Sequence, residues 1–262
     1  MGRENGKTAG MKCLATLVLL TSVISARAEW KVTDSSGLGT LRGGGVVRRA
    51  ELAANGTSAI LTAIVFQSKA YSLRVVDSKS PGHTRLDTSL QDAGCIAGVN
   101  GGYFHDDFRP VGLVIEDGIE VHPFEKAKLL AGVLALRGRQ WEIVRSSAFK
   151  NSPDVRQAIQ CGPMLVESGR PTVGLDATRS ARRTIVATDG RGQWALIYLT
   201  SVTLAGAAEI LATPGAIGDW IPTTALNLDG GSSSGLWAGA SPAEISLPEF
   251  GHVRNYIGIV PR

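Results

Sequence analysis

Short apolar runs recur along the chain and predict a strand-rich fold. Residues 59–66 are almost continuously apolar, and residues 71–77 alternate between apolar and polar side chains, as a half-buried strand does. Residues 183–188 and 194–199 flank an Asp-Gly-Arg-Gly turn and predict a hairpin. Shorter strand-like pieces complete the series: residues 96–99, 111–116, 131–136, 141–145, 164–166 and 256–260.

Three segments carry helical signals instead. Residues 86–93 place apolar side chains on one face, and residues 154–160 follow a Ser-Pro pair typical of a helix start. Residues 203–212 have Thr203 as a cap and apolar side chains at helical intervals. Because strands outnumber helices and do not alternate with them regularly, we predict an α+β fold: a single strand-rich domain, with a mixed sheet and a few packed helices.

The chain divides into three parts by composition. Residues 1–28 resemble a secretory signal peptide, because Lys12 precedes an apolar run at 13–24 and an Ala-Arg-Ala site follows. Residues 29–58 are rich in glycine and predict an irregular lead-in. Residues 59–262 carry the predicted domain. We therefore expect a secreted or periplasmic protein with no membrane span once the signal is removed.

The basic charge of the chain is concentrated in its first residues. The sequence has 27 Lys and Arg and 23 Asp and Glu, of which residues 1–28 hold 4 and 1, so 27 − 4 = 23 basic and 23 − 1 = 22 acidic residues remain. A nearly neutral remainder argues against a nucleic-acid partner.

One stretch of the sequence contains several candidate catalytic and binding residues. Residues 225–235, ALNLDGGSSSG, carry Asp229 to the end of a short apolar run, followed at once by glycines and serines. A carboxylate beside exposed backbone N–H groups suits an oxygen-rich substrate, although a turn with a capping Asp has the same local pattern. Residues 98–104, GVNGGYF, repeat the design, with Asn100 before two glycines. Asn100 and Asn227 are candidates to hydrogen-bond sugar hydroxyls, and Arg183 to hold a phosphate or carboxylate with two donors.

Other catalytic classes have weaker support. Residues 231–235 match G-x-S-x-G, with Glu249 and His252 downstream, which keeps a serine esterase using Ser233 as a further hypothesis. Poor helix material after the serine argues against it. The four histidines are scattered, no metal-binding motif is present, and we assign no metal ligands and no cofactor. Cys95 and Cys161 are equally consistent with one disulfide and with two buried thiols.

Four separated motifs, in this order, resemble the phosphodiester glycosidase family over roughly residues 60 to 262. They are VNGGYF at 99–104 with PVGLVI at 110–115, QCGPMLV at 160–166, RTIVA at 183–187, and LNLDGGSS at 226–233; RNYIGI at 254–259 also resembles the ending of the family. The resemblance implies cleavage of the bond between a sugar anomeric carbon and a phosphodiester. It makes Asn100, Arg183 and Asp229 the catalytic candidates. Candidate substrate-binding residues are Gly101, Gly102, Tyr103, Asn227, Gly230, Gly231, Ser232 and Ser233.

The sequence departs from the family pattern in places. Ser232 stands where the family often has a third glycine, and Cys161 stands where it often has a small residue. We therefore predict an exported hydrolase acting on a sugar-1-phosphodiester or a related envelope glycan. The alternative is a glycan-binding or envelope-assembly protein without catalytic activity on the same fold. The oligomeric state is not indicated by any of these patterns.

Overall fold

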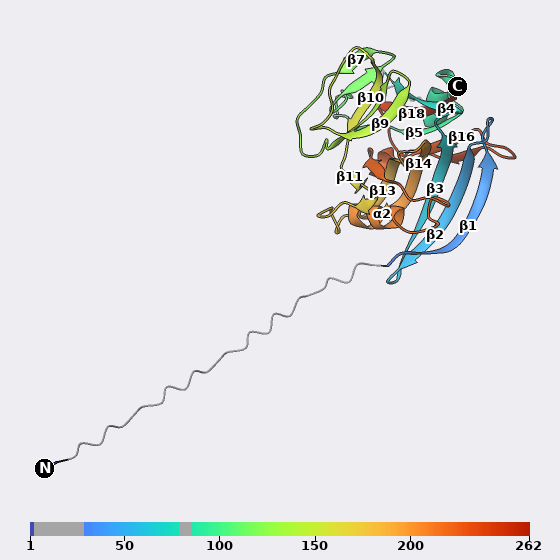
Figure 1. Ribbon diagram of the computed structural model, residues 1–262. Helices are drawn as coiled ribbons and strands as arrows, with labels where there is room; N and C mark the ends of the chain where they lie inside the picture. Colours follow the sequence, from blue (N-terminus) through green and yellow to red (C-terminus); the bar gives the residue numbers. More distant parts are fainter. Residues whose placement is uncertain (3–28, 79–84) are drawn as a thin grey trace.

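A computed structural model describes residues 1–2, 29–78 and 85–262 as three antiparallel sheets and two short helices (Figure 1). The proposed signal segment lies outside the described residues apart from its first two positions. Strands make up 48% of the described residues, so the fold is mostly β rather than balanced α+β. Every strand pairing among the described residues is antiparallel, which corrects the expected mixed sheet.

The largest sheet has eight strands in the order β1-β2-β3-β14-β13-β15-β11-β12. Their bounds are Lys31–Thr40 (β1), Val46–Ala54 (β2), Thr57–Gln67 (β3), Gln193–Val202 (β14), Ala181–Thr188 (β13), Thr224–Asn227 (β15), Met164–Glu167 (β11) and Arg170–Pro171 (β12).

Two five-stranded sheets pack against the eight-stranded sheet. One has the order β7-β6-β10-β8-β9, with bounds Ile119–His122, Val114–Glu116, Val155–Cys161, Gly132–Arg137 and Gln140–Arg145. The other has the order β17-β16-β5-β18-β4, with bounds Ile245–Leu247, Leu236–Ala238, Ala97–Asn100, Asn255–Pro261 and Tyr71–Asp77. The helices are α1 (Leu86–Asp92) and α2 (Leu204–Leu211), and a 3-10 turn, η1, spans Gly231–Ser233.

Alternation along the central strands divides the core into two layers. On β3, Ile64 and Phe66 face the smaller sheets, whereas Leu61 and Ala63 face the layer that contains α2. The predicted helix at α2 is confirmed, and Thr203 caps it by accepting a hydrogen bond from the N–H of Gly206 at 3.0 Å. In Figure 1, α2 lies on the eight-stranded sheet and the smaller sheets stand at its other side.

Two local predictions were wrong for identifiable reasons. Residues 154–160 form β10 rather than a helix, because this strand is paired on both sides, with β6 and β8, and Ala158 and Ile159 are fully buried. Central pairing overrides the local helix-start signal. The expected irregular lead-in contains β1 and β2. Its glycines do not prevent strand formation, because β1 is an edge strand that accommodates them with register shifts near Gly37 and Gly39. The predicted strands at residues 59–66 and 71–77, the hairpin and the helix at residues 86–93 are confirmed.

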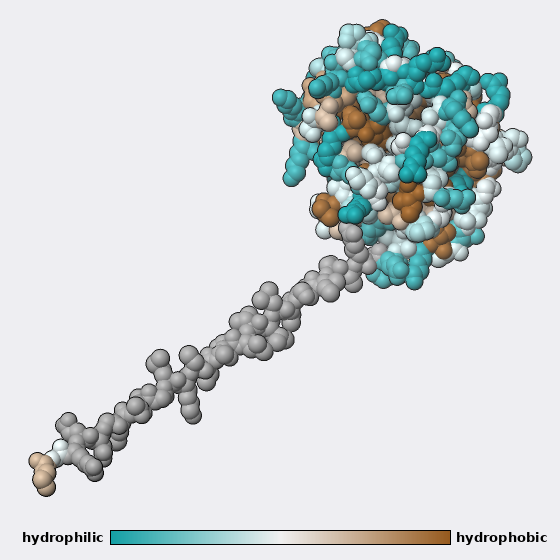
Figure 2. Space-filling model, viewed as in Figure 1, coloured by the Kyte–Doolittle hydropathy of each residue, from teal (hydrophilic) through white to brown (hydrophobic). Residues whose placement is uncertain are grey.

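The visible surface of the folded part is mainly hydrophilic, with scattered hydrophobic residues (Figure 2). No helix among the described residues is long and apolar enough to cross a membrane.

Candidate active site

The two Asn/Asp-glycine loops meet where β5 and β15 end. The N–H of Asp229 donates to the carbonyl of Gly101 at 3.0 Å, and the N–H of Leu228 donates to the carbonyl of Thr184 at 2.8 Å. β15 also pairs with β13, with Ile185 opposite Asn227. This pairing carries the start of β13, and with it Arg183, to the same place. The structure thus brings together Asn100, Arg183 and Asp229, which the sequence placed far apart.

Asn100 is fully buried, and its amide binds the protein itself. The Oδ1 oxygen accepts from Thr184 Oγ1 at 2.6 Å and from the N–H of Gly235 at 3.1 Å. The Nδ2 group donates to the carbonyl of Asp229 at 2.8 Å. These bonds fix the backbone that carries Asp229, so the geometry favours a positioning role for Asn100 over direct contact with a substrate.

The carboxylate of Asp229 is half-buried at the edge of η1. Its Oδ1 oxygen accepts from the N–H of Gly230 at 2.9 Å, and its side chain also bonds to Ser233. Burial raises the pKa of Asp229 to about 6, and the bonds from Ser233 and Gly230 limit the rise. The side chain is therefore able to gain or lose a proton near neutral pH, as a general base or nucleophile must.

Three of the loop glycines, Gly101, Gly230 and Gly231, are required by space or backbone conformation. A Cβ atom on Gly101 would lie 2.1 Å from Oδ1 of Asn255, and that same oxygen accepts from the N–H of Gly102 at 2.7 Å. A Cβ on Gly230 would lie 2.9 Å from the carbonyl oxygen of Arg182, and Gly231 has a φ of +65°. These glycines shape the loops through contacts within the protein, which explains why only glycine fits there.

Arg183 lies beside Gly230, the residue after Asp229, with one donor group available. Its Nε donates to the carbonyl of Val202 at 3.0 Å, and its Nη2 donates to the carbonyl of Arg179 at 2.7 Å. Nη1 has no hydrogen-bond partner among the described residues and lies 3.9 Å from the position of a Cβ on Gly230. Burial lowers the pKa of the guanidinium from its ordinary value, without removing its charge at neutral pH. Arg183 is thus a rigidly held cation that presents Nη1 toward the loop of Asp229.

Behind the carboxylate lies a second layer of polar groups. The hydroxyl of Tyr103 donates to the carbonyl of Gly162 at 2.5 Å, and Nδ2 of Asn227 donates to the same carbonyl at 3.0 Å. Burial, and then electrostatic interaction with Cys161 and Asp229, raise the pKa of Tyr103, so its hydroxyl stays protonated. The Oδ1 oxygen of Asn227 is buried and has no partner among the described residues. Tyr103 and Asn227 therefore form the support behind the site, with one acceptor left unused.

The cysteines are separate buried thiols in this structure. Cys95 packs in the cluster around α1, and Cys161 lies next to Tyr103. Burial raises the pKa of both thiols, and the charge of Asp229 adds to the effect on Cys161. Neither thiol therefore has the character of a nucleophile at neutral pH.

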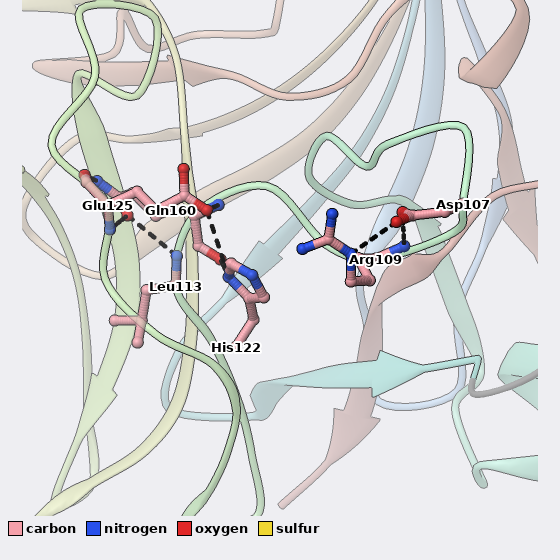
Figure 3. A network of polar contacts seen from close by, with 7 residues as sticks. Asp107, Arg109, Leu113, His122, Glu125 and Gln160 are labelled. Atoms are coloured by element: carbon pink, nitrogen blue, oxygen red, sulfur yellow. Dashed lines mark hydrogen bonds and ion pairs between the residues drawn. The ribbon is translucent and has the colours of Figure 1, made fainter.

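A polar network anchors the loop that covers Gly162 (Figure 3). The buried Gln160 accepts from the N–H groups of Leu113 and Glu125, at 3.0 and 3.1 Å, and His122 Nδ1 bonds to the carbonyl of Gly112. A Cβ on Gly162 would lie 2.2 Å from the carbonyl oxygen of Leu129, so this loop packs directly on Gly162. The network thus holds the carbonyl that orients Tyr103 and Asn227.

Sequence reasoning missed an aromatic residue at the rim. The ring of Phe250, 76% exposed, lies 3.8 Å from the guanidinium carbon of Arg182. Arg182 Nε donates to the carbonyl of Gly231 at 2.9 Å, and the N–H of Phe250 donates to the carbonyl of Ser232 at 2.8 Å. A stacked cation and aromatic ring therefore adjoin the Asp229 loop. No sequence signal marked Phe250, which stands between Glu249 and Gly251 outside the recognised motifs.

The serine arrangement differs from a nucleophile elbow. Ser233 is buried and bonds to Asp229, and Ser232 beside it is exposed. Glu249 accepts from the N–H of Leu86 at 2.8 Å, at the start of α1, so it is engaged in the fold. Among the described residues, no group of three or more His, Cys, Asp or Glu side chains is placed to hold a metal ion.

The comparisons with solved structures identify related folds. The catalytic domain of zebrafish N-acetylglucosamine-1-phosphodiester alpha-N-acetylglucosaminidase, auto-inhibited by its pro-peptide, superposes with a TM-score of 0.59 at 16% identity, covering 91% of this chain and 85% of that one. A hypothetical protein from Synechocystis gives a TM-score of 0.60 at 16% identity, covering 83% of this chain and 62% of that one. A putative exported protein from Burkholderia pseudomallei K96243 gives 0.50 at 11% identity, covering 81% and 74%. At these identities the likeness shows the fold.

Sequence comparison assigns the chain to a family. It is 36% identical over 78 residues to the uncharacterized Escherichia coli (strain K12) protein YigE, and the match spans 27% of this chain and 31% of that protein. The family model described as phosphodiester glycosidase matches residues 93–260, a segment that includes the loops of Asn100 and Asp229 and the strand of Arg183. Over more than half of its length, this chain is a member of the phosphodiester glycosidase family.

Proposed function

We propose that the protein is an exported hydrolase that cleaves the glycosidic bond of a sugar-1-phosphodiester or a related envelope glycan. The observation that carries the proposal is the convergence of Asp229, with its pKa near 6, and the available Nη1 of Arg183 at one glycine-lined loop. Family membership supports the glycosidase class. Export is supported by the signal-like residues 1–28 and by a fold relative described as a putative exported protein.

The proposed reaction uses Asp229 in its ionised form. The carboxylate either removes a proton from the attacking water or attacks the anomeric carbon itself. Burial and two hydrogen bonds set its pKa, and no second carboxylate among the described residues contributes. Many glycosidases need a second carboxyl group to protonate the departing oxygen. Here the leaving group would be a phosphate monoester, whose second pKa is about 6, so it departs without that proton.

The positive groups would act on the leaving group. Nη1 of Arg183 is placed to donate to a phosphate oxygen, and charge that builds up there as the C–O bond breaks would strengthen the contact. Because Nε and Nη2 are held by backbone carbonyls, Arg183 needs little reorganisation. The exposed face of Phe250 beside Arg182 is suited to pack on the group that the phosphate carries.

The first experiment incubates the purified mature chain with UDP-GlcNAc and a panel of sugar-1-phosphodiesters, and measures free sugar. We expect release by the wild type, loss of at least about 100-fold in Asp229→Asn, and unchanged release in the matched exposed control Asp219→Asn. If both Asp229→Asn and Arg183→Ala retain hydrolysis, the assignment of the site is wrong. Binding of these ligands without any release would favour a glycan-binding protein.

The variant Ser233→Ala distinguishes the serine esterase hypothesis from the proposed glycosidase reaction. Because Ser233 donates to Asp229 and lowers its pKa, we expect this variant to keep hydrolysis and to shift the acid limb of the pH profile upward. A serine nucleophile would instead make Ser233→Ala inactive and would label the wild type with a fluorophosphonate. Sequencing the N-terminus of the protein recovered from the cell exterior or periplasm tests export and cleavage near residue 28.

A further inference from the structure

A concave site lies at the far end of the strands that carry the candidate active site. β13 carries Arg183, whose Nη1 lies near Gly230, and ends at Thr188, which pairs with Trp194 of β14. At about 3.3 Å per residue, the two ends are about 17 Å apart. A cleft of about 850 Å³ opens there, between the β3–β4 turn, the β13–β14 turn and the β8–β9 hairpin. Its volume lies within the range of small-molecule pockets.

Hydrogen bonds between backbone segments hold the walls of this cleft together. The N–H of Ser68 donates to the carbonyl of Gly192 at 2.9 Å, which joins two of the turns. Arg262 bridges the other wall, because its Nε donates to the carbonyl of Tyr71 at 2.9 Å and its Nη2 donates to the carbonyl of Arg139 at 3.0 Å. The cleft is therefore formed before any ligand arrives, and the guanidinium of Arg262 is fixed within it.

The lining carries a local excess of positive charge. Lys69, Arg139, Arg191 and Arg262 line the cleft, and none of them forms an ion pair with another described residue. Glu142 is the acidic residue of the lining, and it is engaged by Arg137 at 3.2 Å. Beyond residue 28 the chain is nearly neutral, so this gathering of unpaired cations is a property of the fold rather than of composition. Such a site attracts anions.

An aromatic ring gives the cleft a second kind of surface. Trp141 lines it, and its indole N–H donates to Ser72 Oγ at 3.0 Å, so the ring is held in one orientation. A fixed aromatic ring among polar groups suits a ligand that has both apolar and polar faces, as a sugar does. Guanidinium groups suit phosphate, sulfate or carboxylate substituents.

We propose that this cleft is a binding site, separate from the Asp229 site, for a saccharide that carries anionic groups. The choice of a saccharide rests on the proposed function, whereas the preference for anions rests on the four cations alone. In a long anionic glycan, one segment would occupy the cleft while another reaches the Asp229 loop.

The test measures binding of a sulfated heparin tetrasaccharide by calorimetry at low salt, with the catalytically silent Asp229→Asn chain to prevent turnover. The cleft variant is Lys69→Ala/Arg139→Ala/Arg191→Ala, whose side chains make no hydrogen bond to described residues. Its matched control, Lys126→Ala/Lys128→Ala/Arg170→Ala, removes the same charge from exposed positions outside the cleft.

We expect the cleft variant to bind the tetrasaccharide at least about 10-fold more weakly and the control to bind it unchanged, with affinity falling as salt rises. Trp fluorescence should change on binding in the Asp229→Asn chain, and most of that change should be lost when Trp141→Phe is added, because the other tryptophan of the lining, Trp194, is buried. An equal loss in the control, or no binding at all, would overturn the cleft as a site. Tripolyphosphate binding as tightly as the tetrasaccharide would overturn the choice of a saccharide.

Because binding is measured without turnover, the inference and the proposed function fail in different ways. If the Asp229→Asn chain does not bind the tetrasaccharide while the wild type hydrolyses small sugar-1-phosphodiesters, only the inference is rejected. Binding at the cleft in a chain that hydrolyses nothing rejects only the proposed reaction.

Discussion

Asp229→Asn should make the protein more stable at neutral pH while removing its activity. In an unfolded chain Asp ionises near pH 3.9. In the fold, burial raises the pKa of Asp229 to about 6. The difference of about two pKa units, at about 1.36 kcal/mol each, makes the ionised carboxylate cost the fold about 3 kcal/mol.

The sign of this effect follows from proton binding. Between pH 4 and 6 the folded state holds a proton that the unfolded chain has already released, so rising pH destabilises the fold through this window. Below pH 4 the carboxyl group is neutral in both states and costs nothing. Above pH 6 to 7 it is charged in both states, and the full cost applies. Asparagine stays neutral and keeps the oxygen that accepts from Gly230.

Water that reaches the half-buried carboxylate screens part of the cost, so we expect Asp229→Asn to gain about 1 to 3 kcal/mol at pH 8 and about zero at pH 4. Urea unfolding at pH 4, 6 and 8 measures the free energy of unfolding of both proteins. Asp219→Asn, at an exposed position, is the control and should change stability by less than about 0.5 kcal/mol at every pH. A destabilised Asp229→Asn, or a gain that does not vary with pH, would refute the reasoning.

Four further outcomes are expected. Gly101→Ala should destabilise the fold by about 3 kcal/mol or more in urea unfolding, because its Cβ would lie 2.1 Å from Oδ1 of Asn255; near-wild-type stability would contradict the close packing. Asn100→Ala should cost about 2 to 4 kcal/mol, because it leaves three buried partners unsatisfied, and a variant as stable as the wild type would show that these bonds are not needed. Phe250→Ala should leave stability within about 0.5 kcal/mol while raising KM for a bulky phosphodiester about 10-fold, and an unchanged KM in steady-state kinetics would exclude the ring from the site. In the wild type, kcat/KM should rise with pH through about 6, as Asp229 ionises, and a pH-independent rate would argue against the carboxylate.

The spatial proximity of the site residues was predictable because their motifs have the same pattern of a short strand, a polar residue and two glycines. Asn100 ends the buried strand β5, and Asp229 lies two residues after the end of β15. Each precedes two glycines, and both loops meet where these strands finish. The hairpin of β13 and β14 and the helix cap at Thr203 were also predictable, because the residues that favour turns and helix caps act locally. Local signals thus identified the elements that carry the site.

Features that depend on pairing between distant segments could not be predicted from local sequence patterns. The segment at 154–160 has local helix signals, yet it becomes a central strand because β6 and β8 pair with its two edges. The burial of Asn100 was also hidden, because its partners Thr184 and Gly235 come from distant parts of the chain. Phe250 reaches the site only through the path of its loop. In each case the missing information was a contact between residues far apart in sequence.

The position of β18 has a consequence for the time at which this protein folds. β18, which follows every other strand of the described residues, lies between β5 and the edge strand β4 and pairs with both. Until ribosomes have made it, β4 and β5 lack their central partner, and the loop of Asn100 lacks the support of Asn255. Such late, distant pairing delays the folding of this sheet until β18 has been made. A nascent chain that remains unfolded for so long is in the state required for threading through a translocation channel, as the proposed export would demand.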